Sequence, residues 1–119
     1  MPRRSLPAKE TLLRAVKLAR HPHVRFPQVR ERFGLSERRL REAKKTLALE
    51  ATWTDDDLVL AALYEQPKGM APSAIIEFID WVDHSRWSDA ELATRLENLR
   101  GAGAVIEREG RWHLARPWP

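Results

Sequence analysis

Five basic side chains lie close together in the stretch FGLSERRLREAKKTL, residues 33–47, behind a glycine and a serine. They are Arg38, Arg39, Arg41, Lys44 and Lys45. Guanidinium and ammonium groups bind phosphate oxygens, and the planar guanidinium can also donate two hydrogen bonds to one guanine. The spacing therefore indicates either a surface that binds a polyanion or a charged helix face that is simply solvated.

Other side chains that could do chemistry are scattered. The four histidines are His21, His23, His84 and His113. Only His21 and His23 have even a weak metal-ligand spacing, and a polar loop explains them better. Asp80, Asp83 and His84 could imitate an acid-base cluster, but a helix C-terminus that favours a nearby cation is the simpler interpretation. The chain has no cysteine, phosphate-binding loop or nucleophile elbow. We therefore expect no enzyme, no metal site and no cofactor.

The charge is distributed very unevenly along the 119 residues. Residues 1–50 hold 14 Lys and Arg against 5 Asp and Glu, a net charge of +9, whereas residues 51–119 hold 7 against 12, a net charge of −5. Together they give the formal net charge of +4. A basic half joined to an acidic half predicts a polyanionic partner for the first half and a different partner for the second.

Nothing in the sequence indicates a membrane segment. No apolar stretch approaches the ~18 residues of a membrane span. The start, MPRRSLPAKE, has cations but no apolar run behind them. We therefore expect neither a signal peptide nor a membrane anchor, and a cytoplasmic protein.

The basic stretch needs helices to position it, and three are predicted in the first half, over residues 8–21, 27–34 and 37–49. Leu12, Val16 and Ala19 would line one face of the first helix. Pro27 suits the start of the second helix, where a missing N–H costs nothing, and Gly34 suits its end.

The pattern of three helices recurs in the second half, over residues 56–66, 72–84 and 89 to about 100. Thr54 is a typical N-cap, followed by three aspartates that favour the positive helix end. The stretch AVIEREGRWHLA, residues 104–115, predicts a β-hairpin around Glu109 and Gly110. The expected fold is mainly α, with two tri-helical units over residues 1–50 and 51–119, the second ending in a hairpin.

A weak internal repeat relates the two halves. The repeat pairs residues that lie 52 positions apart: Ser36 with Ser88, Leu40 with Leu92, and Leu47 with Leu99. Either serine can cap the free N–H groups of the helix that follows it. The common spacing predicts that the third helices of the two units are built alike.

Residues 26–45 resemble a helix-turn-helix motif, with Gly34 at the turn and Val29, Leu35, Leu40 and Ala43 at the apolar positions that hold the two helices together. Arg30 departs from the motif, because it takes a place usually held by a small residue. The resemblance implies that residues 37–49 form a helix that enters the major groove of DNA.

The helical period divides the residues of that helix between two sides. Ala43, Lys44 and Leu47 are expected on the buried side with Leu40, and Arg38, Arg39, Arg41, Glu42, Lys45 and Thr46 are expected to face outward. We predict that Arg38, Arg39, Arg41 and Lys45 carry DNA binding, with phosphate contacts from Arg25, Arg30, Arg32, Arg3 and Arg4.

Residues 54–115 resemble a winged helix. They are also similar to small bacterial winged-helix proteins that have an acidic residue and a histidine just before the third helix, where this chain has Asp83 and His84. The resemblance implies a recognition helix over residues 89–99. The outward side of that helix is expected to hold Ala90, Glu91, Ala93, Thr94, Glu97 and Asn98, two carboxylates without a cation. Because phosphates would repel this side, we expect residues 51–119 to bind a protein partner or to form a homodimer.

The predicted function is sequence-specific or general binding of double-stranded DNA, with transcriptional regulation as the role. The alternative is a protein–protein interaction adaptor that uses its winged helices without binding DNA. The sequence leaves open whether Trp81, Trp87, Trp112 and Trp118 lie in the core or at an interface.

Overall fold

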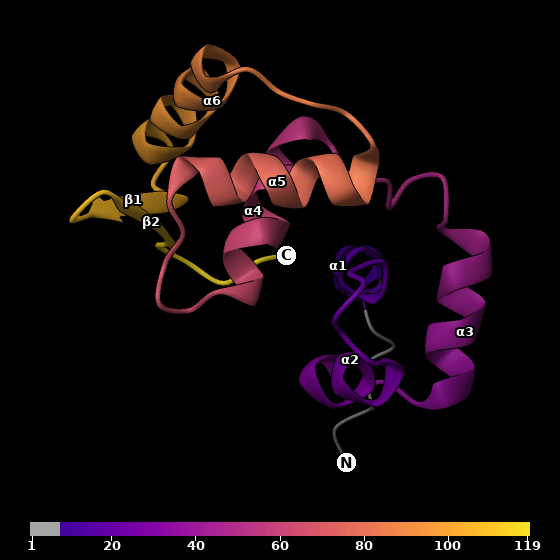
Figure 1. The fold of residues 1–119 in the computed structure, drawn as a ribbon. Coiled ribbons are helices and arrows are strands. Elements are labelled where there is room, and N and C mark those ends of the chain that lie inside the picture. Colours follow the sequence, from indigo (N-terminus) through magenta and orange to yellow (C-terminus); the bar gives the residue numbers. More distant parts are fainter. Residues whose placement is uncertain (1–7) are drawn as a thin grey trace. The chain divides into compact units, whose positions relative to one another are not determined.

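In the computed structural model, which describes residues 8–119, six helices precede a two-stranded antiparallel hairpin (Figure 1). The predicted fold class, mainly α with a C-terminal hairpin, is confirmed. The described chain divides into two compact units, one ending at Thr52 and the other spanning Trp53–Trp118. None of the helices in the described part of the chain is long and apolar enough to span a membrane.

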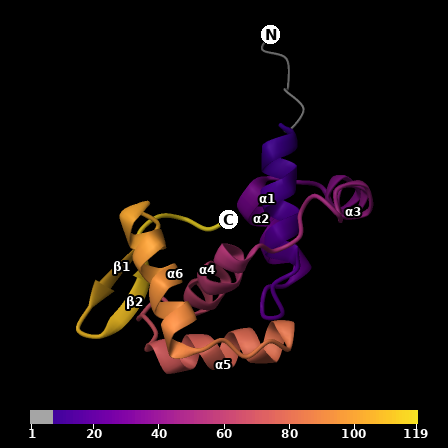
Figure 2. The same cartoon turned by 90° about the horizontal axis from the view of Figure 1, so that it is seen from above.

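The first unit contains α1 (Lys9–Ala19), α2 (Phe26–Phe33) and α3 (Glu37–Thr46). Both α2 and α3 pack against α1. Val16 of α1 meets Ala43 in the core, together with Leu47 and Ala51 from the turn that follows α3. In both views α3 runs in a clearly different direction from α1 (Figures 1 and 2). One helix therefore serves as the platform that holds the other two.

Two helices of the first unit end two or more residues earlier than the sequence predicted. The first helix ends at Ala19 instead of residue 21, because the residue before Pro22 is disfavoured in helical backbone. The third ends at Thr46 instead of residue 49. There the chain turns so that Leu47 and Ala51 become buried, and the Ala51 N–H donates to the Leu47 carbonyl at 2.9 Å. Tertiary burial overrides the continuing helical pattern.

The second unit contains α4 (Asp55–Glu65), α5 (Pro72–Asp83), α6 (Asp89–Gly101), β1 (Val105–Arg108) and β2 (Arg111–Leu114). Of these, α4 contacts α5, α6 and β2. It is accordingly apolar on most of its sides, with Leu58, Val59 and Leu63 all buried. The unit is therefore organised around α4.

The hairpin turns at Glu109 and Gly110, as predicted, and both residues have positive φ, 53° and 77°. Two consecutive left-handed residues are the requirement of a type I′ turn, which suits the twist of a two-stranded ribbon. On β2, Trp112 is buried and also pairs with Met70 from the loop between α4 and α5, through bonds of 3.0 and 2.9 Å. The sequence analysis missed this additional bridge, since a single residue gives no strand pattern.

The tryptophans have different environments. Trp112 and Trp118 are buried in the second unit, Trp87 is half-buried, and Trp81 is 55% exposed. The tail around Trp118 is irregular, as predicted, but its indole ring contacts Trp53 and Tyr64 with centroid distances of 5.6 and 5.8 Å. Trp118 is therefore a core residue.

Candidate nucleic-acid interface

The turn between α2 and α3 has the backbone that the sequence predicted. Gly34 adopts φ 63°, in the left-handed region, and the Leu35 N–H donates to the Arg30 carbonyl at 3.0 Å. The Ser36 hydroxyl then accepts the Arg39 N–H at 3.1 Å, which caps the first turn of α3. These contacts fix where α3 begins.

The apolar positions of the motif are all buried, as predicted: Val29, Leu35, Leu40 and Ala43. Leu40 and Ala43 cover the inner side of α3 and leave its other side to solvent. These apolar contacts therefore hold α3 against the rest of its unit.

The exposed side of α3 carries most of the predicted cations. Arg38, Arg41 and Lys45 are exposed, and Arg39 is half-buried. A shallow hollow of about 600 Å³ is lined by Ser36, Glu37, Arg38, Arg41, Glu42 and Lys45. The structure therefore brings three of the four principal candidates to one hollow.

Two carboxylates interrupt this basic surface. The Arg38 Nε lies 3.4 Å from the Glu42 Oε1, and an Arg41 Nη2 lies 2.6 Å from the Glu37 Oε1. All four side chains are more than half exposed, and exposed pairs one helical turn apart typically contribute only about 0.3–0.5 kcal/mol. A stronger partner can displace them. Within residues 8–119, no carboxylate forms an ion pair with Arg39 or Lys45.

Phe26 at the start of α2 contacts two cations of α3, a role that the sequence analysis missed. The Arg41 guanidinium and the Lys44 ammonium lie 5.9 and 5.7 Å from its ring centroid. Such cation–π contacts orient the side chains without neutralising them. Lys44 is exposed, although its position in the helical period predicted the buried side. Its long side chain can cover the ring while its charge stays in water.

The residues predicted to contact phosphates are placed less uniformly. Arg25 is exposed at the start of α2, where its backbone N–H donates to the Gln28 Oε1 at 2.8 Å. Arg30 is half-buried, and its Nε donates to the Leu35 carbonyl at 3.5 Å, so it belongs to the turn. The Arg32 guanidinium lies 5.1 Å from the Phe33 ring centroid. Arg3 and Arg4 lie outside the described residues.

The corresponding helix of the second unit has the same start and a different surface. The Ser88 hydroxyl accepts the Glu91 N–H at 3.1 Å, and Leu92 is buried as Leu40 is. The residues predicted to face outward are all exposed: Ala90, Glu91, Ala93, Thr94, Glu97 and Asn98. None of these six residues carries a positive charge.

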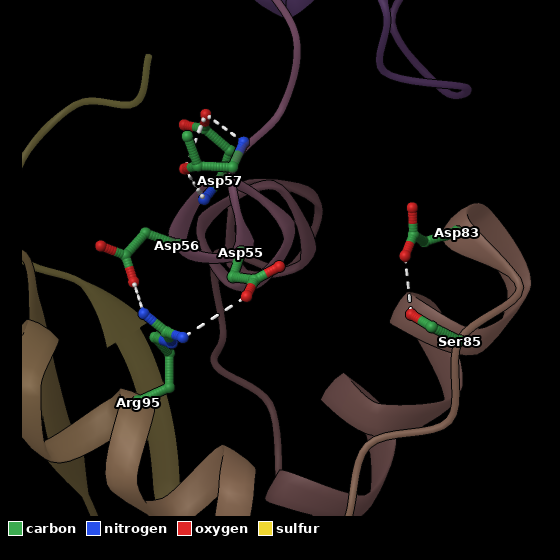
Figure 3. Close-up of polar contacts among 7 residues, drawn as sticks. Asp55, Asp56, Asp57, Asp83, Ser85 and Arg95 are labelled. Atoms are coloured by element: carbon green, nitrogen blue, oxygen red, sulfur yellow. Dashed lines mark hydrogen bonds and ion pairs between the residues drawn. The ribbon is translucent and has the colours of Figure 1, made fainter.

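The two cations of α6 are paired with carboxylates. Arg95 lies between Asp55 and Asp56 of α4, with nitrogen–oxygen distances of 3.5 and 3.3 Å (Figure 3). Arg100 pairs with Glu97 one turn away. The neighbouring hollow, of about 450 Å³, is lined by Asp55, Trp87, Ala90, Glu91, Thr94, Arg95 and Asn98. The electrostatic contrast between α3 and α6 thus persists in three dimensions.

Asp80 and Asp83, near the end of α5, contact different polar side chains, Arg86 and Ser85. Asp83 accepts a hydrogen bond from the Ser85 hydroxyl at 2.6 Å (Figure 3). His84 is exposed and ends α5 with φ 56°. Across residues 8–119, no three His, Asp or Glu side chains are grouped so that they could hold a metal ion.

Comparisons of the chain with protein-family models, with curated proteins and with solved structures found no match.

Proposed function

We propose that the chain binds double-stranded DNA through the exposed side of α3, and that it acts in transcriptional regulation. The observation that carries the proposal is the division of α3 into two sides. Leu40 and Ala43 hold the helix in the core, while Arg38, Arg41 and Lys45 reach solvent together. A helix fixed in this way can enter the major groove without rearrangement of its own unit.

Electrostatics supports a polyanion such as DNA as the partner of this surface. Duplex DNA carries one negative charge per ~1.7 Å of its axis, so a row of cations gains several phosphate contacts at once. The residues of the first half carry a net charge of +9. Arg39 and Lys45 have no carboxylate partner within the described chain, so their binding to phosphate breaks no ion pair.

In the same proposal the second unit is a winged helix that contacts a protein or a second copy of the chain. Three helices followed by a hairpin support that interpretation. The cations of α6 are already paired with carboxylates. The exposed Glu91 and Glu97 disfavour DNA at this helix, because their negative charges would face phosphates.

An electrophoretic mobility shift with the full chain and a random-sequence duplex tests the proposal. The variant Arg38→Ala/Arg41→Ala should bind at least about tenfold more weakly, because contacts to phosphates and base edges are lost. The control Lys68→Ala/Arg86→Ala removes the same charge from exposed sites of the second unit and should bind nearly as the unaltered chain does. Equal weakening by the two variants would remove α3 from the interface.

The second candidate is an adaptor whose partners are all proteins. The exposed Trp81 on α5 favours it, since large aromatic side chains concentrate binding energy at protein interfaces. A chain that shifts no duplex even at low salt would establish this candidate over the first.

A further inference from the structure

Arg38 and Glu42 are neighbours on the exposed side of α3. Two shallow hollows adjoin the helix, one containing Arg41 and Lys45 and the other containing Arg39. Both hollows are lined by Arg38, Glu42 and Ser36. The side chains of Arg38 and Glu42 are 90% and 58% exposed, and the Arg38 Nε lies 3.4 Å from the Glu42 Oε1. Whatever approaches α3 from outside therefore meets a cation and a carboxylate side by side.

Glu42 is unsuited to a surface that binds phosphates alone. A carboxylate only accepts hydrogen bonds, and phosphate oxygens also only accept. In the major groove, by contrast, cytosine N4 and adenine N6 are donors that a carboxylate can meet. Arg38 has the opposite preference, because its fork donates to guanine N7 and O6.

We propose that Arg38 and Glu42 act as a pair that recognises G·C base pairs, with the guanidinium on guanine and the carboxylate on the cytosine amino group. One G·C pair presents both acceptors and that donor on its major-groove edge. The Arg38 Nε and the Glu42 Oε1 lie 3.4 Å apart, which is about the length of one base-pair step. The two side chains therefore reach the same or adjacent base pairs. The inference rests on the proposed DNA binding by α3.

A matched pair of variants tests the role of Glu42. Glu42→Gln and Glu50→Gln each remove one negative charge from the first unit, at side chains that are 58% and 53% exposed. The probe is a duplex enriched by the unaltered chain from a random library, compared with its scrambled sequence. The unaltered chain and Glu50→Gln should prefer the enriched duplex by about tenfold or more.

Glu42→Gln should bind the scrambled duplex more tightly and lose most of that preference. Its own enriched duplexes should carry adenine where the unaltered chain selects cytosine, because a glutamine amide pairs with adenine N6 and N7. A second probe replaces guanine by 7-deazaguanine, which lacks the N7 acceptor. This substitution should lower the affinity of the unaltered chain for the duplex severalfold, and it should leave the affinity of Arg38→Ala unchanged.

The outcomes separate this inference from the function on which it rests. If the chain binds no duplex, the proposed function fails and the inference fails with it. If it binds all duplexes equally, or if Glu42→Gln and Glu50→Gln show the same preference, DNA binding stands and recognition by the pair is refuted.

Discussion

Asp57 is the polar residue on which much of the second unit depends. It is 7% exposed. Its Oδ2 accepts the Thr54 N–H at 2.9 Å, and its Oδ1 accepts the Trp118 indole N–H at 3.1 Å. The first contact closes the capping box of α4, and the second ties the irregular tail to that helix. One carboxylate thus joins segments that lie 61 positions apart.

Replacing Trp118 by alanine should lower the free energy of unfolding by about 3–5 kcal/mol, because a buried aromatic side chain is lost. Its hydrogen bond to Asp57 is lost as well. Urea denaturation followed by circular dichroism measures the change. Trp81→Ala is the control, and since Trp81 is 55% exposed we expect a much smaller loss. Similar losses for the two variants would show that Trp118 is not an anchor of the fold.

At the scale of elements, α3 and α6 begin in the same way and serve different surfaces. Ser36 and Ser88 each accept a backbone N–H three residues later, both at 3.1 Å. Beyond the caps, α3 presents Arg38 and Arg41 to solvent, whereas α6 presents Glu91. The shared start and the different surfaces allow stability and binding to be tested separately.

Ser36→Ala and Ser88→Ala should each destabilise the chain by about 1 kcal/mol, since each removes one helix cap. Only Ser36→Ala should also weaken duplex binding, because fraying at Arg39 disturbs the turn that carries Arg38. Thermal unfolding and a mobility shift measure the two effects. The assignment of binding to α3 would be contradicted if Ser88→Ala weakened duplex binding, or if Ser36→Ala left duplex binding unchanged.

Several elements were predictable because their signals are local. Gly34, Ser36 and Thr54 mark helix ends through their own backbone or side-chain chemistry, and Glu109 and Gly110 mark the hairpin turn. The early end of α3 was not predictable, since it results from burial of Leu47 and Ala51 against α1.

Contacts between positions far apart in the sequence could not be predicted either. The Met70 bridge, the Trp118 anchor and the packing of Phe26 under Arg41 each depend on the folded chain. For the candidate site, the period of α3 predicted which arginines reach solvent. It could not predict that Arg38 and Arg41 form ion pairs with Glu42 and Glu37, since side-chain conformations decide that.

For the whole molecule, the central feature is a basic first half joined to an acidic second half. In the proposed function, long-range attraction would draw DNA to the first half, and repulsion would steer it away from the second. The charge asymmetry is evident in the sequence, and in the structure Arg38, Arg41 and Lys45 of α3 are exposed to solvent. We therefore expect that phosphate contacts dominate the association with DNA.

The salt dependence of duplex binding measures how far phosphate contacts determine the affinity. With four to six phosphate contacts, the logarithm of the association constant should fall with the logarithm of salt concentration with a slope of about −4 to −5. Arg39→Ala/Lys45→Ala should reduce the magnitude of that slope by about 2, since it removes two such contacts. An affinity independent of salt, or an unchanged slope in the variant, would contradict the account.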